Sequence, residues 1–259
     1  MTESELSEAE LVAGANGGRA GRDDAAAPAA PARAGRRRPE VRGETGPYRG
    51  AGAPGPRTRC FEAAVRGYLE RRPEATVVAL GEGLGTGFWR LDNGRLTWLT
   101  VQPPEAAAVR RMLLPDGARR RTVARAVSDH GWLNAVREPR RGVIVMAQGA
   151  LMRLAPLAVR ALLAACAERF PDGVLVFDAL PRSAAALARR GAAAHRLSGG
   201  RWPAPARWGL DRAELPRLAS VHPHIAEVRE LGVRRAVYGR LPVLREVLPL
   251  VCEVRFAGP

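Results

Sequence analysis

Three short runs of apolar residues constrain the fold of this chain more than any other feature of its sequence. They cover residues 76–80, 143–147 and 174–177, and Val, Ile, Leu and Ala supply most of their side chains. A run that is apolar at nearly every position is typical of a strand buried on both faces of a sheet. Stretches with helical spacing separate the runs, and such an alternation predicts a parallel α/β sheet.

The remaining segments extend this alternation. We expect helices at 61–69, 105–114 and 156–170, and further strands at 96–101, 236–238 and 250–256. Residues 121–127 fit a short strand or a helix, and the pattern leaves both open. Residues 180–210 contain two Trp and many Arg, Gly and Pro, so we expect an irregular insertion there.

The chain divides into a tail and one domain. Residues 1–56 are rich in Ala, Gly, Pro and Arg and hold almost no large apolar side chains. Such a segment cannot bury enough surface to offset the loss of chain entropy on folding, so we expect it to be disordered. Residues 57–259 are long enough to form a core of their own.

All 41 basic residues are Arg, and the net charge is +15. The tail holds equal numbers of Arg and acidic residues, so the excess belongs entirely to residues 57–259. Codon bias towards Arg explains this composition, and a surface that binds polyanions is the functional alternative. Within residues 57–259 the arginines are scattered among acids and the densest run covers only 119–121, so nucleic-acid binding is disfavoured.

The cysteines, the leader region and the longest apolar stretch each exclude a class of protein. Cys60, Cys166 and Cys252 form no Cys-x-x-Cys motif, so we expect neither a metal site nor a disulfide framework. No secretory signal is recognisable, and Arg residues interrupt the apolar region 142–167. We therefore expect a cytoplasmic protein without a membrane span, and its oligomeric state stays open.

A glycine-rich turn follows the first apolar run. Gly81, Gly83 and Gly85 come directly after residues 76–80. Glycines there let a backbone approach a ligand closely, at the carboxyl edge of the sheet where ligands bind. The third glycine of a dinucleotide fingerprint would stand at Thr86, which argues against NAD and favours another adenosine-bearing cofactor. A tight turn without a ligand is the structural alternative.

Several stretches, taken in order, resemble the leucine carboxyl methyltransferase family, most closely its bacterial polyketide-type O-methyltransferase branch. The matching stretches are 57–62, 77–83 with 88–91, 98–105 with 110–111, 128–132, 148–152, 170–173 with 177–178, and 207–209. The resemblance implies a Rossmann-like class I fold with a mostly parallel sheet, an antiparallel C-terminal strand and a cap insertion. It also implies S-adenosylmethionine as cofactor and methyl transfer to a carboxyl or hydroxyl group of a small molecule, as in secondary metabolism.

The resemblance assigns a cofactor contact to six residues. They are Arg57 at the methionine carboxylate, Gly81 and Gly83 along the methionine and ribose, Gln102 at the ribose, Asp129 at the adenine amino group, and Gln148 near the sulfonium. A guanidinium suits a carboxylate because it donates two parallel hydrogen bonds. An amide at position 102 forms hydrogen bonds but carries no charge, so we expect a weaker hold on the ribose.

The chain departs from the family pattern at several charged positions. Gly85-Thr86-Gly87 replaces the usual Asp-Thr-Arg, and Thr100, Gln102 and Gln148 stand where acids are expected. Fewer carboxylates weaken the attraction for a cationic cofactor. Two readings therefore stay open: a divergent methyltransferase, or a catalytically inactive binding or scaffold protein with a basic surface.

No catalytic residue emerges from the sequence. We expect His130, His195, His222 and His224 to be loop or surface residues, because no spacing pairs any of them with a carboxylate. Four arginines could face the pocket of an acidic methyl acceptor, but we expect them to be solvated on the surface. They are Arg153, Arg182, Arg201 and Arg207.

Overall fold

The computed structural model describes residues 54–190, 206–232 and 249–258. The predicted disordered tail falls almost entirely outside these ranges, as do the predicted strand at 236–238 and the residues Arg201 and His195. Only residues 54–56 of that tail are described, and Pro56 already belongs to the first described helix.

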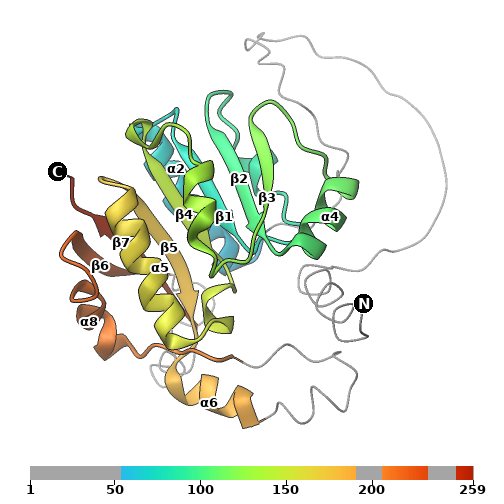
Figure 1. Cartoon of the computed structure of the whole chain (residues 1–259). Coiled ribbons are helices and arrows are strands. Elements are labelled where there is room, and N and C mark those ends of the chain that lie inside the picture. Colours follow the sequence, from blue (N-terminus) through green and yellow to red (C-terminus); the bar gives the residue numbers. More distant parts are fainter. Residues whose placement is uncertain (1–53, 191–205, 233–248, 259) are drawn as a thin grey trace, which may run out of the picture.

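A seven-stranded sheet organises the described chain, with the strand order β3-β2-β1-β4-β5-β7-β6 (Figure 1). The strands are β1 (Thr76–Leu80), β2 (Thr97–Gln102), β3 (Arg120–Ala124), β4 (Val143–Ala147), β5 (Val174–Ala179), β6 (Ile225–Leu231) and β7 (Leu250–Phe256). Strands β1 to β5 are parallel, whereas β7 pairs antiparallel with both β5 and β6. The predicted fold class, a mostly parallel Rossmann-like sheet with an antiparallel C-terminal strand, is confirmed.

Helices lie before, between and after the parallel strands. They are α2 (Pro56–Arg71), α3 (Gly87–Leu91), α4 (Pro104–Leu113), α5 (Pro156–Arg169), α6 (Arg182–Arg190) and α8 (Leu215–Ala219), with short 3₁₀ helices η1 (His130–Ala135), η2 (Pro139–Arg141), η3 (Leu151–Arg153) and η4 (Arg212–Glu214). Proline begins α2, α4 and α5, where its fixed φ suits the first turn and no backbone N–H is needed.

Each face of the sheet has its own hydrophobic core. Val77 and Ala79 of β1 point to one face, where they pack with Phe61 and Val65 of α2. On the opposite face the alternate β1 side chains pack with α5 and with Trp132 of η1. Every residue of β1, β4 and β5 is buried as a result, which confirms that the apolar runs are strands covered on both sides.

Three expectations for local structure are resolved or corrected. Residues 120–124 form strand β3 rather than a helix. The segment 180–210 is not irregular throughout, because α6 occupies Arg182–Arg190. Strand β6 was not expected: most of its side chains are at least partly exposed, so it lacks the apolar run that marks the central strands.

Candidate functional site

The predicted cofactor residues gather at the carboxyl edge of the parallel strands. Gly81 and Gly83 follow β1, Gln102 ends β2, and Gln148 follows β4. Because these strands are parallel, their carboxyl ends meet at one edge of the sheet. Strand order reverses between β1 and β4, and the crevice at such a switch point is where open α/β sheets bind ligands.

The glycine turn is a sharp bend at this switch point. Gly81 and Gly83 have φ values of +64° and +60°, which residues with a Cβ rarely adopt. The amide N of Gly81 donates to the Val101 carbonyl at 2.8 Å, so the turn stays in register with β2. A Cβ at Gly81 would lie 3.2 Å from the Ala150 Cβ, so the backbone after β1 closely approaches the loop after β4.

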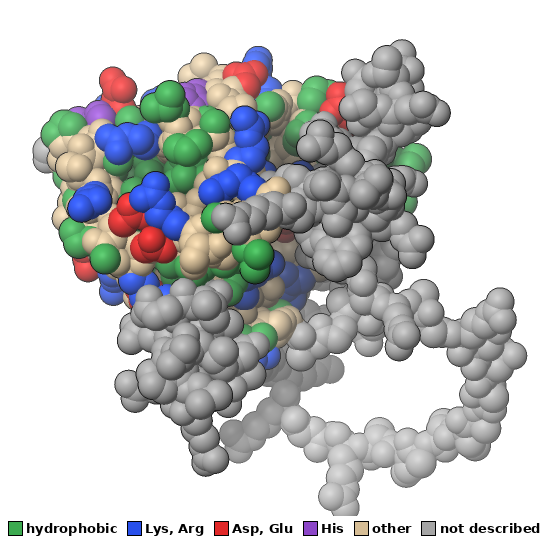
Figure 2. Space-filling model, turned by 90° about the horizontal axis from the view of Figure 1, so that it is seen from below, with side chains coloured by type: hydrophobic (Ala, Val, Ile, Leu, Met, Phe, Trp, Pro, Cys, Tyr) green, Lys and Arg blue, Asp and Glu red, His purple; other side chains and the backbone are tan. Residues whose placement is uncertain are grey.

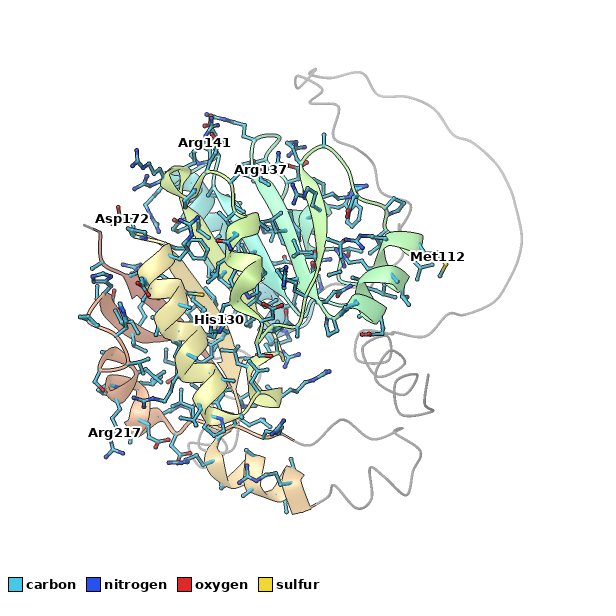
Figure 3. All side chains as sticks on the ribbon, viewed as in Figure 1. Met112, His130, Arg137, Arg141, Asp172 and Arg217 are labelled. Carbon is cyan, nitrogen blue, oxygen red and sulfur yellow. The ribbon has the colours of Figure 1, made fainter. Side chains whose placement is uncertain are left out.

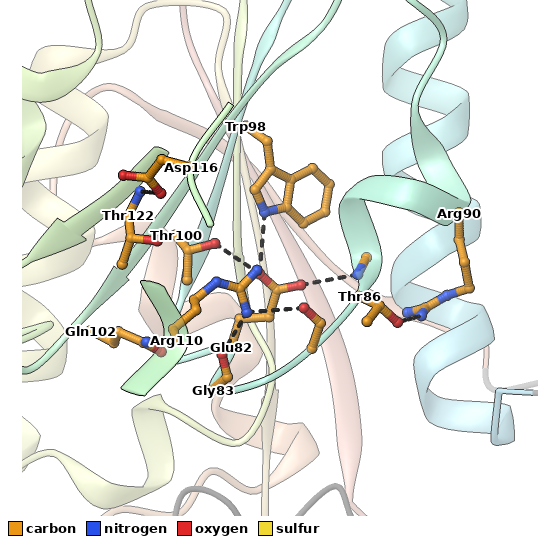
Figure 4. A network of polar contacts seen from close by, with 12 residues as sticks. Glu82, Gly83, Thr86, Arg90, Trp98, Thr100, Gln102, Arg110, Asp116 and Thr122 are labelled. Atoms are coloured by element: carbon orange, nitrogen blue, oxygen red, sulfur yellow. Dashed lines mark hydrogen bonds and ion pairs between the residues drawn. The ribbon is translucent and has the colours of Figure 1, made fainter. Parts of the chain in front are cut away.

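A buried ion pair supports the turn (Figure 4). Glu82 accepts hydrogen bonds from the Gly87 amide at 3.1 Å, the Trp98 indole at 3.2 Å and the Thr100 hydroxyl at 3.0 Å. Its Oε2 also lies 3.3 Å from a guanidinium nitrogen of Arg110. The carboxylate is thus surrounded by four partners from α3, β2 and α4.

Arg110 also fixes the backbone of the turn. Its Nη1 donates to the Gly83 carbonyl at 2.5 Å and to the Gly85 carbonyl at 3.0 Å. Both side chains of the Glu82–Arg110 pair are almost fully buried. The turn is therefore held in one conformation by the protein itself.

Gln102 presents one unsatisfied group. Its side chain is buried, and Nε2 donates to the Ala106 carbonyl at 2.7 Å, at the start of α4. Its Oε1 has no hydrogen-bond partner among the described residues. Buried polar atoms are rarely left unpaired, so this oxygen is available to a donor from outside the protein.

Arg57 is held by a second acid, Asp178. Nη1 of Arg57 donates to Asp178 Oδ2 at 2.8 Å, and the amide of Gly149 donates to Oδ1 at 2.6 Å. Burial raises the pKa of the Asp178 carboxyl, and the Arg57 charge opposes this rise. The Asp178 side chain is 0% exposed and that of Arg57 is 46% exposed, so much of the Arg57 side chain remains accessible to solvent or a ligand.

Gln148 and Asp129 have protein partners of their own. Gln148 Nε2 donates to the Thr58 hydroxyl at 3.0 Å, which links the loop after β4 to the first turn of α2. Asp129 caps η1 by accepting from the Gly131 amide, and it accepts from Arg125 at 2.7 Å. These hydrogen bonds lower the pKa of Asp129, which stays ionised and exposed to solvent.

Sequence reasoning missed Glu82, Arg110 and Asp178 as parts of this site. Two signals were present. Glu82 is an acid between two glycines at the end of a buried strand, and Asp178 is an acid that directly follows the apolar run 174–177. An acid at the end of such a run is expected to be buried, and a buried acid needs a partner.

The histidines form no catalytic pair among the described residues. The rings of His222 and His224 lie 4.9 Å apart in an exposed loop before β6, and His130 begins η1. No described histidine is hydrogen-bonded to a carboxylate. Nor does the described part of the chain bring together three His, Cys, Asp or Glu side chains suited to a metal ion.

Comparison with known proteins finds a relative by sequence. The chain is 28% identical over 126 residues to the tetracenomycin polyketide synthesis O-methyltransferase TcmP of Streptomyces glaucescens. The alignment covers 48% of this chain and 46% of the relative, so it spans less than half of that protein. No protein family model matches the chain.

A solved structure with a TM-score above 0.5 shares the fold. A DUF574 family protein from Streptomyces avermitilis superposes with a TM-score of 0.56 at 11% identity, over 79% of this chain and 83% of that one. An O-methyltransferase family protein from Burkholderia thailandensis gives a TM-score of 0.49 at 18% identity, over 78% and 56% of the two chains.

None of the helices within the described ranges combines the length and apolar character needed to cross a bilayer.

Proposed function

We propose that the protein is an S-adenosylmethionine-dependent O-methyltransferase that acts on a carboxyl or hydroxyl group of a small molecule. The observation that carries this proposal is the glycine turn at the switch point between β1 and β4. The sequence similarity to an O-methyltransferase supports the reaction type, since the alignment covers 48% of the chain.

The residues at this edge fit the cofactor. Gly81 and Gly83 offer a backbone that a ligand can approach, and the unpaired Oε1 of Gln102 suits a ribose hydroxyl. The accessible guanidinium of Arg57 suits a carboxylate, and the exposed carboxylate of Asp129 suits an amino group. Gln148 would lie near the sulfonium, as the family resemblance implies.

When bound, the cofactor supplies a methyl group on a positively charged sulfur. The protein then has to hold an acceptor oxygen in line with that methyl group and exclude water. A carboxylate oxygen is already ionised and needs no base, whereas a hydroxyl usually needs one. No described histidine has a carboxylate partner, so the residues present suit an acceptor that arrives as an anion.

The charge balance predicts a modest affinity for the cofactor. Glu82 and Asp178 both lie at this edge, but each is paired with an arginine. Little net negative charge remains to attract a sulfonium, which agrees with the acids missing from the sequence pattern. A polyketide-type acceptor and a cytoplasmic location are further parts of the proposal; the first rests on the resemblance and the relative's name, the second on the sequence.

The paired acids also favour a second candidate function. A methyltransferase-like fold that has lost its free carboxylates can persist as a catalytically inactive binding or scaffold protein with a basic surface. The two candidates differ in one measurable property, which is whether the protein binds the cofactor.

Isothermal titration with S-adenosylmethionine and S-adenosylhomocysteine tests the proposal. We expect both to bind, and Arg57→Gln to weaken binding at least about tenfold because a charge-assisted contact is lost. Arg137→Gln is the matched control, because Arg137 is an exposed arginine at the opposite end of the molecule from α6 (Figure 3). The absence of heat at millimolar ligand would overturn the proposal and favour the scaffold.

A further inference from the structure

A cavity of about 420 Å³ opens between α5, α6, α8 and the segment 206–210. None of the six predicted cofactor residues lines it. Its volume lies within the range of about 300–1,000 Å³ that is usual for small-molecule sites.

The floor of the cavity is apolar. Trp208, Leu210 and Leu218 line it, and all three are buried members of the core on the α5 face of the sheet. The Trp208 ring packs against Phe177 of β5 with ring centroids 5.8 Å apart. A rigid aromatic floor of this kind suits a flat apolar group.

The rim of the cavity is strongly basic. Five arginines line it, from α5, α6, the segment 206–210 and α8: Arg160, Arg182, Arg189, Arg207 and Arg217. Figure 2 looks at the molecule from this lower side and shows blue Arg side chains around a small group of acidic ones. All five arginines are exposed, and four of them, all except Arg182, have charged ends free to meet a ligand.

The acid in the lining does not neutralise this rim. Glu214 pairs with Arg182 at 2.6 Å, and its second oxygen accepts from the Asp211 amide at 3.2 Å. The other four arginines have no carboxylate at ion-pair distance among the described residues. The cavity therefore keeps a large positive charge above an apolar floor.

The wall of the cavity is hydrogen-bonded to two segments that follow residues of the candidate cofactor site. The amides of Arg207 and Trp208 donate to the Met152 carbonyl at 2.7 and 3.1 Å, and Met152 lies four residues after Gln148. The amide of Leu210 donates to the Leu180 carbonyl at 2.8 Å, two residues after Asp178. The wall is thus fixed to the segments that leave the carboxyl ends of β4 and β5.

We propose that this cavity binds the methyl acceptor, and that the acceptor is an anionic molecule with a flat apolar portion. The assignment to an acceptor rests on the proposed methyl transfer. Arg207 and Arg160 bind the anionic group, and Trp208 supports the apolar portion. This class of acceptor agrees with the absence of a histidine–carboxylate pair from the described residues, because an ionised oxygen needs no general base.

The test compares two aromatic probes of the same shape. We expect 2-naphthoate to bind in isothermal titration and the neutral 2-naphthamide to bind at least about tenfold more weakly, because only the carboxylate forms charge-assisted contacts. Arg207→Gln and Arg160→Gln should each weaken naphthoate binding several-fold, whereas Arg137→Gln should leave it unchanged. Equal affinity for the two probes would overturn the proposal, as would an equal loss in all three variants.

Titrations with S-adenosylhomocysteine separate this proposal from the proposed function. We expect it to bind wild type and Arg207→Gln equally, and naphthoate to bind the complex with S-adenosylhomocysteine. Mutual exclusion of the two ligands would overturn the acceptor assignment. If naphthoate behaves as expected but S-adenosylhomocysteine never binds, the methyl transfer and the acceptor role are contradicted while the anion site is supported.

Discussion

At Gly87 the space that a side chain would need is already filled. A Cβ there would lie 2.8 Å from the Trp98 ring and 3.0 Å from Glu82 Oε1, and a Cβ at Gly85 would lie 2.5 Å from Glu82 Cγ. Glycine at positions 85 and 87 therefore leaves the room that Glu82 occupies.

This crowding predicts the effect of adding one methyl group. We expect Gly87→Ala to lower the free energy of unfolding by about 1–3 kcal/mol, because Trp98 is buried and cannot move aside easily. In Gly67→Ala the new Cβ meets nothing within 4 Å, and in a helix interior it should stabilise by roughly 0.5–1 kcal/mol. Urea unfolding measures both, and a Gly87→Ala variant as stable as wild type would contradict the prediction.

The buried carboxyl of Asp178 predicts a pH dependence. Burial raises its pKa in the folded protein, so the folded state binds the proton more tightly and loses stability as the pH rises through that pKa. The Asp178→Asn variant lacks this titration. The stability of wild type relative to this variant should thus be highest near about pH 4, the ordinary range of the group, and fall towards neutral pH.

Asp92 provides the control, because we expect its contribution to the free energy of unfolding to change with pH in the opposite direction. Its hydrogen bonds from Arg119 lower the pKa of Asp92, so wild type should lose stability relative to Asp92→Asn as the pH falls through the lowered pKa. Urea unfolding across the pH range gives both slopes. Slopes of the same sign would show that the two carboxyls are not in the environments described.

At the scale of secondary structure, two acid–arginine pairs hold the elements of the candidate site together. Glu82 and Arg110 join the turn after β1 to α4, while Trp98 and Thr100 add β2. Arg57 and Asp178 join α2 to β5, and Gly149 adds the loop after β4. Each pair both positions a site residue and connects segments that are distant in the sequence.

The Glu82–Arg110 pair suits a double-mutant cycle. We expect Glu82→Gln or Arg110→Gln alone to cost about 3–5 kcal/mol, because each leaves the other charge buried without its partner. The double variant should cost clearly less than the sum of the single variants, since no unpaired charge remains. Urea unfolding of all four proteins measures the coupling, and simple additivity would argue against a buried pair.

At the scale of the whole molecule, the excess positive charge lies outside the two hydrophobic cores. Two cores cover the faces of the sheet, and the net charge of +15 is carried by residues outside them. Several exposed ion pairs offset part of this charge, but such pairs contribute little individually. Self-repulsion among the excess arginines therefore remains as a destabilising term.

Salt should consequently stabilise the protein. We expect the midpoint of urea unfolding to rise when NaCl increases from low concentration to about 0.15 M, where the screening length falls to about 8 Å. Screening of the repulsion should outweigh the weakening of the surface ion pairs, because like charges are in excess. A midpoint that falls with added NaCl would mean that the ion pairs dominate.

The sequence by itself determined the alternation of elements, the central strands and the turn that ends β1. These features depend on local residue types: apolar runs, helical spacing, proline at helix starts, and glycine where the backbone must bend sharply. Strand β6 was not predicted because an edge strand needs no apolar run. Helix α6 was not predicted because it lies among Arg and Gly residues that suggested a loop.

Only the tertiary structure decided which charges meet. Nothing local in the sequence indicates that Arg57 pairs with Asp178, 121 positions away, or that Glu82 is enclosed by Trp98, Thr100 and Arg110. It likewise took the fold to gather five scattered arginines around one cavity. The order of strands in the sheet sets these contacts, and that order follows from packing the whole chain rather than from any short stretch of it.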